Sequence, residues 1–301
     1  MRELQLAANG LRFRCLADGP DGGPLALLLH GFPEGAASWR AQLEALAGAG
    51  YLAVAPDLRG YGGTDRPDGE DAYRMAHLVD DVVGLVDALG RDRCHLAGHD
   101  WGALVGWSVA GRRPDRLLTW SALSVGHPRA FTEAIRDDAD QRRRSSYVDL
   151  FRQAGRAEAV LTEDGCRRLR ALYRVGLRSN PVPEAQVDEF VRSLSRPGRL
   201  TAGLNYYRAN LGEEAGRAFP AEDPIATPAQ LIWGDQDPAL GPLQARLTGR
   251  YVAADYRLEV LEGAGHWLQF ERPDEVSRLL LDWIGARTKP PPPPGEGAHM
   301  G

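Results

Sequence analysis

The stretch CHLAGHDWGALVGWSVAGR, residues 94–112, decides the fold. It opens with a short apolar run, turns at Gly98-His99-Asp100-Trp101-Gly102 and continues with the apolar spacing of a helix. A strand, a tight turn and a helix in this order can present a nucleophile at the turn. The two glycines permit the turn and a close approach of strand and helix. We therefore expect the Asp100 side chain at a helix N-terminus, where a negative charge is stabilised.

Strand-like and helix-like segments alternate on both sides of this stretch. An antiparallel pair at 4–8 and 11–16, joined at Asn9-Gly10, comes first. The expected strands are 25–29, 51–55, 94–98, 117–125, 229–233 and 256–261, and the expected helices are 39–49 (with Ser38 as N-cap), 75–89 (ended by Gly90), 101–112 and 273–286. This alternation predicts an α/β fold with a mostly parallel sheet covered on both faces.

The alternation stops near residue 127 and resumes near residue 221. The sequence between these points is helical, rich in arginine and interrupted by glycine and proline, with no buried strand. We therefore predict a helical cap at 128–220, inserted into a core formed by 1–127 and 221–286. Five consecutive prolines at 290–294, followed by Gly-Glu-Gly, predict that 287–301 form a disordered tail.

Composition excludes several classes of function. The chain has 36 basic and 41 acidic side chains, a net charge of −5, which argues against nucleic acid or an anionic membrane as partner. No apolar run approaches the roughly 18 residues of a membrane helix, and no signal peptide is visible. Cys15, Cys94 and Cys166 are widely spaced and odd in number, so we expect no disulfide framework, no metal site and a reducing cytoplasm. We interpret the basic run 142–144 as a solvated helix face rather than a phosphate site.

An aspartate at the turn changes the chemistry from that of a serine hydrolase. A carboxylate is already ionised at neutral pH and needs no base before it attacks. Its natural target is an electrophilic saturated carbon, which gives an alkyl ester that water must then cleave. The alternative is that Asp100 only caps the helix that follows. Ser124 lies in a partly similar segment, residues 122–126, which has lost its first glycine and is followed by no helix.

Cleavage of the ester needs a base, an acid to orient the base, and an oxyanion hole. His266 follows the last predicted strand, and Asp237 follows the strand before it, with Asp235 as the alternative acid. The backbone amides of Trp101 and Phe32 are the expected oxyanion donors. A cis bond between Phe32 and the next proline is compatible with the sequence.

Glu34 has two interpretations. Its side chain could orient the hydrolytic water, or it could only cap its own loop. We expect His30 and Gly31, in the same loop, to be structural.

The segments His-Gly-Phe-Pro-Glu (30–34), Asp-Leu-Arg-Gly-Tyr-Gly (57–62) and Gly-His-Asp-Trp-Gly (98–102) resemble motifs of the α/β-hydrolase fold family and, within it, of the epoxide hydrolases. The resemblance covers residues 3–286. It implies an eight-stranded, mostly parallel sheet with an inserted helical cap. It also implies a soluble, bacterial-type enzyme that needs no cofactor or metal and acts on a small-molecule epoxide, with a role in detoxification.

An opened epoxide leaves as an alkoxide, which needs a proton from an acid that is protonated at neutral pH. Tyrosine, with a pKa of about 10, suits this task. The resemblance places one donor at Tyr207, within residues 204–208, and the other at Tyr147, within residues 147–153. The second match is looser, because Ala154 stands where the family often has proline. Tyr206 and Tyr173 are the alternatives.

Two other functions remain open from sequence. A haloalkane dehalogenase shares the Asp-Asp-His set, but its halide site usually has Asn, Gln or Glu where this chain has Phe32. A ligand receptor built on a hydrolase scaffold is the alternative from another class. Formation of a diol, of free halide, or of neither product separates the three. The sequence leaves the choice between monomer and homodimer open.

Overall fold

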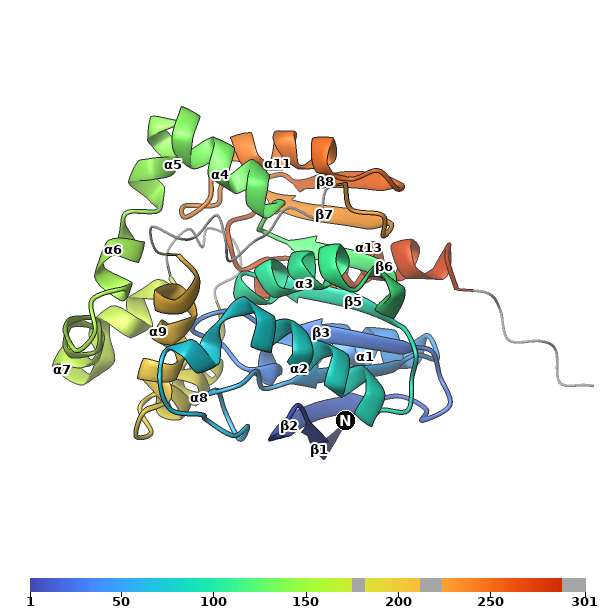
Figure 1. Cartoon of the computed structure of the whole chain (residues 1–301), viewed down its shortest axis with the longest axis horizontal. Coiled ribbons are helices and arrows are strands. Elements are labelled where there is room, and N and C mark those ends of the chain that lie inside the picture. The colour runs from blue at the N-terminus through green and yellow to red at the C-terminus, as the bar shows by residue number, and fades with distance from the viewer. Residues whose placement is uncertain (175–181, 212–223, 289–301) are drawn as a thin grey trace, which may run out of the picture.

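The computed structural model describes residues 1–174, 182–211 and 224–288. An eight-stranded sheet crosses it in the order β1-β2-β4-β3-β5-β6-β7-β8 (Figure 1). Its strands are β1 (Arg2–Ala8), β2 (Leu11–Asp18), β3 (Leu25–Leu29), β4 (Leu52–Pro56), β5 (Cys94–His99), β6 (Leu117–Leu123), β7 (Ala229–Gly234) and β8 (Tyr256–Leu261). Strand β2 is antiparallel to β1 and β4, and the other neighbouring pairs are parallel. The predicted α/β class is confirmed.

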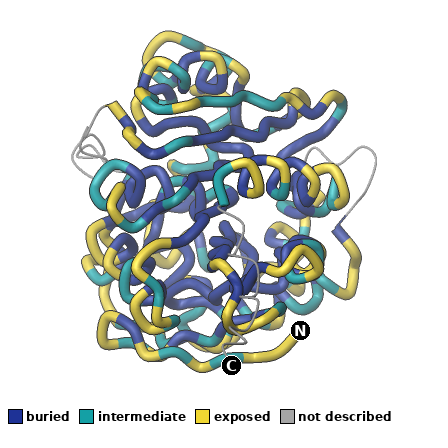
Figure 2. The backbone as a smooth tube through the Cα atoms, turned by 90° about the vertical axis from the view of Figure 1, so that its right-hand side faces the viewer, coloured by how far each residue is buried: buried dark blue, intermediate teal, exposed yellow. Residues whose placement is uncertain are grey.

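Burial along the strands follows their place in the sheet. Strands β3, β4, β5 and β7 are buried at every residue, as expected of parallel strands covered on both faces. Edge strand β1 instead alternates between exposed and less exposed residues. It joins β2 through Asn9 and Gly10, whose φ angles of 45° and 74° fit a two-residue hairpin turn. Figure 2 shows the buried backbone in the interior and exposed segments around it.

Helices cover both faces of the sheet. On one face α2 (Met75–Ala88) packs against α3 (Trp101–Arg112), and on the other α1 (Arg40–Gly48) packs against α13 (Pro273–Gly285). The short helices α11 (Pro242–Thr248) and α12 (Leu268–Glu271) follow β7 and β8 in the chain. Gly90, with φ of 68°, lies just past the end of α2 as predicted.

The prediction that Ser38 caps α1 is wrong. Ser38 lies within a 3-10 turn, Ala36–Trp39, and its hydroxyl donates to the Gly35 carbonyl at 2.9 Å. The residue directly before α1 is Trp39, and no side chain caps this helix.

Six helices of the described residues lie between β6 and β7 in the chain. They are α4 (Pro128–Asp137), α5 (Ala139–Arg144), α6 (Tyr147–Phe151), α7 (Arg156–Leu172, with non-helical backbone at Glu163–Cys166), α8 (Glu184–Leu194) and α9 (Arg199–Asn210). Figure 1 shows α5 to α9 grouped beyond one end of the sheet. Buried side chains of these helices, such as Phe151 and Tyr207, belong to the same apolar cluster as Phe32 and the sheet. From residue 289 onward, the predicted tail lies outside the described residues. No described helix is both long and apolar enough to cross a membrane.

Candidate active site

Asp100 occupies a strained turn between β5 and α3. Its φ and ψ are 51° and −118°, a conformation that side chains with a Cβ rarely adopt. The flanking glycines make the turn possible. A Cβ on Gly98 would lie 2.4 Å from the Gly102 carbonyl oxygen, and a Cβ on Gly102 would lie 2.1 Å from that of Leu29. The turn therefore has the geometry that the sequence predicted for a nucleophile.

The strain at Asp100 gives a test of stability. The observed angles suit glycine, so Asp100→Gly should be more stable than Asp100→Ala, which keeps the Cβ, by about 1 kcal/mol. Urea denaturation of the two variants measures this difference. Equal midpoints would mean that the strain at this turn is no larger than the stability that glycine loses through the greater entropy of its unfolded chain.

The two carboxylate oxygens of Asp100 face different groups. Oδ1 accepts a hydrogen bond from the Phe32 backbone N–H at 2.8 Å, and Oδ2 lies 3.6 Å from Nε2 of His266. Burial alone raises the pKa of Asp100, but hydrogen bonding and charge from His266, together with the Phe32 bond, bring its pKa below the ordinary value. Asp100 is thus ionised at neutral pH, with Oδ2 on the side that faces His266.

Both predicted oxyanion donors lie beside Asp100. Phe32 already donates its N–H to the carboxylate, and its bond to Pro33 is cis. Trp101 is the first residue of α3, where backbone N–H groups have no partner within the helix. The first helical bonds to the Asp100 carbonyl come from Ala103 and Leu104. The Trp101 amide, next to Asp100 in the chain, therefore has no acceptor within its own helix.

His266 and Asp237 form a buried pair on the other side of Asp100. Nδ1 of His266 lies 2.7 Å from Oδ2 of Asp237. Burial lowers the pKa of His266, but the carboxylates of Asp237 and Asp100 outweigh burial and hold it well above the ordinary value. The alternative acid, Asp235, instead accepts a bond from the Gly263 amide at 2.8 Å. The structure brings Asp237, and not Asp235, to the histidine.

The backbone of His266 is fixed by two side chains. Its carbonyl accepts bonds from the Ser124 hydroxyl at 2.8 Å and from Nε2 of His99 at 2.9 Å. Ser124 is fully buried and its hydroxyl is hydrogen-bonded to this carbonyl, which disfavours a role as nucleophile. Its hydroxyl helps to hold the histidine loop in place.

Glu34 is buried, and its carboxylate is hydrogen-bonded on both oxygens. Its Oε2 accepts the Gly31 amide at 3.0 Å and lies 3.0 Å from Nδ1 of His99, while Oε1 accepts from Gln269 at 2.8 Å. These contacts favour support of the loop that carries Phe32. His30, with Nε2 accepting from Leu58, is structural in the same way.

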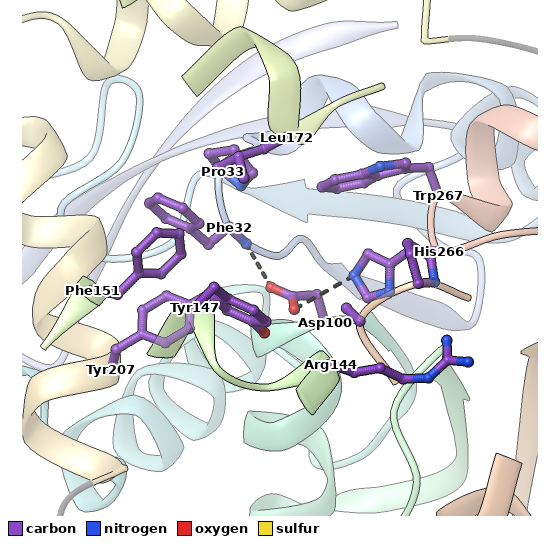
Figure 3. Close-up of a pocket in the computed structure, with 12 residues that line it drawn as sticks. Phe32, Pro33, Asp100, Arg144, Tyr147, Phe151, Leu172, Tyr207, His266 and Trp267 are labelled. Atoms are coloured by element: carbon purple, nitrogen blue, oxygen red, sulfur yellow. Dashed lines mark hydrogen bonds and ion pairs between the residues drawn. The ribbon is translucent and has the colours of Figure 1, made fainter. Parts of the chain in front are cut away.

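Tyr147 and Tyr207 project from α6 and α9 toward Asp100. In the view of Figure 3 they lie across the carboxylate from His266. Burial first, and the Asp100 charge next, raise the pKa of both hydroxyls, so both stay protonated at neutral pH. The alternatives are committed elsewhere, because the Tyr206 hydroxyl donates to the Arg59 carbonyl and that of Tyr173 to the Pro33 carbonyl.

Asp100, His266 and the two tyrosines line one cavity of about 230 Å³ (Figure 3). Its lining is mostly apolar and comes from the core and from the inserted helices: Phe32, Pro33, Asp100, Arg144, Tyr147, Phe151, Leu172, Tyr207, Pro238, Ala239, His266 and Trp267. The described residues contain no group of three His, Cys, Asp or Glu side chains that could hold a metal ion. The cavity suits a small apolar molecule with one reactive polar group.

Sequence reasoning missed part of the site. Arg142 and Arg143 are exposed, as expected of a solvated face, but Arg144 lines the cavity and donates to the Asp237 carbonyl. The three arginines at 142–144 look alike in the sequence, so nothing there indicates that only Arg144 contacts Asp237. The role of His99 was also not predicted, although it lies next to Asp100 in the motif.

Comparisons with known proteins match this chain along most of its length. The model of the α/β hydrolase fold family matches residues 24–273. Epoxide hydrolase A of Mycobacterium tuberculosis is 36% identical, over 94% of this chain and 97% of that protein. Epoxide hydrolase 3 of Xenopus tropicalis is 35% identical, over 93% of this chain and 77% of that protein. The crystal structure of a Bacillus megaterium epoxide hydrolase with an inhibitor superimposes with a TM-score of 0.84 at 30% identity, over 94% of this chain and 100% of that one.

Proposed function

Since the chain belongs to the α/β-hydrolase fold family and, within it, to the epoxide hydrolases, we propose that it converts an epoxide into a vicinal diol through an ester on Asp100. One observation carries the proposal: a carboxylate at a nucleophile turn lies between a base and two tyrosines within one apolar cavity. The likeness of the chain to epoxide hydrolases supports the choice of substrate.

Ring opening is the first half of the reaction. Oδ2 of Asp100 attacks one ring carbon, and the bond from that carbon to the ring oxygen breaks. The oxygen takes a proton from Tyr147 or Tyr207, which leaves a tyrosinate and a hydroxyalkyl ester. Oδ1, held by the Phe32 amide, becomes the ester carbonyl oxygen.

Ester cleavage is the second half. His266 takes a proton from water, and the hydroxide attacks Cγ of Asp100. The oxyanion forms on Oδ1, beside the amides of Phe32 and Trp101. Collapse breaks the bond from Cγ to the alkyl oxygen, which takes the proton from His266. The new carboxylic acid returns its proton through solvent to the tyrosinate, so one epoxide and one water give one diol.

The charges of the two carboxylates beside His266 explain when this histidine can act as a base. In the free enzyme two carboxylates stabilise protonated His266. Ester formation removes the charge of Asp100, which lowers the pKa of His266. The base is therefore released at the stage of the reaction that needs it.

An isotope experiment tests the ester mechanism. With enzyme in excess over an aryl epoxide in H₂¹⁸O, the first turnover should give unlabelled diol, because the new oxygen comes from Asp100. With substrate in excess, label should enter the diol in later turnovers. Label in the first turnover would mean direct attack by water. Free halide from a haloalkane, with no diol from epoxides, would instead indicate a dehalogenase.

Removal of both tyrosine hydroxyls should block ring opening. In Tyr147→Phe/Tyr207→Phe the alkoxide loses its proton donors, so ester formation should slow by about 10²–10⁴-fold. Rapid-quench intact-mass measurement of the ester reports this step directly. Tyr206→Phe is the matched control, since that hydroxyl bonds to the Arg59 carbonyl. Unchanged ester formation in the double variant would remove both tyrosines from the mechanism.

The two half-reactions should respond differently to pH. Asp100 stays ionised at pH 5 because its pKa is lowered, so ring opening should change little between pH 5 and 8. Ester cleavage needs neutral His266 and should slow by about tenfold for each pH unit below its pKa in the ester. The fraction of enzyme present as ester should thus rise as the pH falls. If the fraction of enzyme present as ester were largest at high pH, neutral His266 would not be the base for ester cleavage.

We also propose a role in detoxification in a reducing cytoplasm. Three cysteine thiols that are free in the described residues suit a reducing compartment. Fractionation of the native cells, with diol formation as the assay, tests this location.

A further inference from the structure

Helix α5 holds the loop that carries Asp237. We call residues 237–241, which follow β7, the acid loop. Arg144 donates from Nη1 to the carbonyl of Asp237. Gln141 donates from Nε2 to the carbonyl of Ala239 at 3.2 Å, and its Oε1 accepts the amide of Gly241 at 2.7 Å. Helix α5 thus makes three hydrogen bonds to the backbone of the acid loop.

The side chain of Gln141 is fixed on all sides. It is completely buried, and the acid loop uses one bond at each end of its amide. The remaining partners are the Ser145 hydroxyl at 2.9 Å and Nε2 of Gln244 at 3.2 Å. A buried amide with every group bonded has one orientation, so it sets the position of the backbone that it contacts.

The acid loop in turn sets the carboxylate of Asp237. Its Oδ1 accepts the amides of Ala239 and Leu240 at 2.8 and 3.0 Å, and its Oδ2 faces His266. A displacement of the loop backbone therefore moves the carboxylate relative to the imidazole. Figure 3 shows the Arg144 side chain extending away from Asp100, so its influence on the reaction is indirect.

We infer that Gln141 and Arg144 are positioning residues that hold the acid loop, and through it His266, in the geometry for ester cleavage. The inference rests on the proposed function, because the ester mechanism has two separate steps. Asp237 takes part in ester cleavage and not in ring opening. Ring opening uses Asp100 and the tyrosines, whereas ester cleavage uses His266 and Asp237. Loss of the hydrogen bonds from α5 to the acid loop should therefore slow ester cleavage selectively.

Neighbouring arginines provide a matched pair for the test. Arg143 and Arg144 both pair with Asp140 on the same helix. Only Arg144 also reaches the Asp237 carbonyl, and Arg143 is exposed. Arg144→Ala and Arg143→Ala each remove one arginine and one pairing with Asp140, so their difference reports the contacts that only Arg144 makes, with the acid loop and with the cavity wall. A change in the cavity wall alone would alter ester formation as well, whereas loss of the contact with the acid loop should alter ester decay.

Rapid-quench intact-mass measurement with an aryl epoxide gives the rates of ester formation and ester decay. We expect Arg144→Ala to slow decay by about tenfold or more, as misplaced catalytic groups do, and to change formation by less than about twofold. The ester should accumulate at steady state while kcat falls. Arg143→Ala should match the wild type in both rates.

Gln141→Met keeps the length of the buried side chain and removes its hydrogen bonds, so it provides a second variant. It should also slow decay selectively, whereas Gln153→Ala, an exposed glutamine of the same segment, should not. Equal slowing of both steps in Arg144→Ala and Gln141→Met, or no difference from the controls, would overturn the inference while leaving the ester mechanism intact. Absence of an ester in the wild type and every variant would overturn the proposed function first.

Discussion

Asp100→Ala abolishes diol formation, with an expected loss of at least about 10⁴-fold. No other described carboxylate lies both on the turn after β5 and against the Phe32 amide and His266. Without Asp100 no ester can form, and His266 has no acyl group at which to direct water. Chromatographic assay of the diol over long incubation measures the residual rate.

Two controls make this loss interpretable. Thermal unfolding shows whether Asp100→Ala remains folded, and binding of the unreacted epoxide shows whether the cavity persists. A variant that is folded, binds substrate and makes no diol supports the nucleophile. Turnover within about tenfold of the wild type would place the nucleophile elsewhere and leave Asp100 as a helix cap.

His266→Ala should stall after ring opening and accumulate the ester. Asp100, the tyrosines and the oxyanion donors remain, so the first step proceeds, whereas hydroxide is no longer generated beside Cγ of Asp100. Ester decay should slow by about 10³-fold or more. Intact mass after exposure to an aryl epoxide should show a gain equal to the whole epoxide.

The same variant separates the two enzymatic functions. After exposure to a haloalkane, a gain equal to the alkyl group without its halogen would assign a dehalogenase. The double variant Asp100→Ala/His266→Ala subtracts alkylation of the cysteines. No gain that depends on Asp100 from either compound would favour a receptor. Asp237→Ala should resemble His266→Ala in direction, whereas Asp235→Ala should not, because Asp235 bonds to the Gly263 amide instead.

Local patterns were enough to predict the parts of the site that lie on one motif. The two glycines at 98 and 102, on either side of Asp100, are enough to predict the turn. A Cβ at either glycine would collide with backbone atoms. Strands such as β3 were predicted residue for residue, because a buried parallel strand is a continuous apolar run. These features depend on neighbours in sequence.

Features that depend on distant neighbours could not be predicted. Glu34 meets His99 and Gln269, which lie 65 and 235 residues away, and no pattern in one sequence specifies such partners. Arg144 looked like its exposed neighbours, because the run of charge does not reveal that Asp237 lies opposite one member. The choice between Asp235 and Asp237 likewise needed the path of the loop.

The position of β7 in the sheet has a consequence for folding order. Strand β7 pairs with β6, with Trp120 opposite Ala229, although roughly 100 residues of chain separate them. Closing a loop of that length costs about 4 kcal/mol of chain entropy beyond a constant term. The strands from β1 to β6 can pair through shorter connections, so we expect them to associate first. The nucleophile and the Phe32 donor belong to this early part, whereas the acid and the base arrive with β7 and β8. A nascent chain would thus acquire the carboxylate that the epoxide alkylates before it acquires the acid and the base that regenerate this carboxylate.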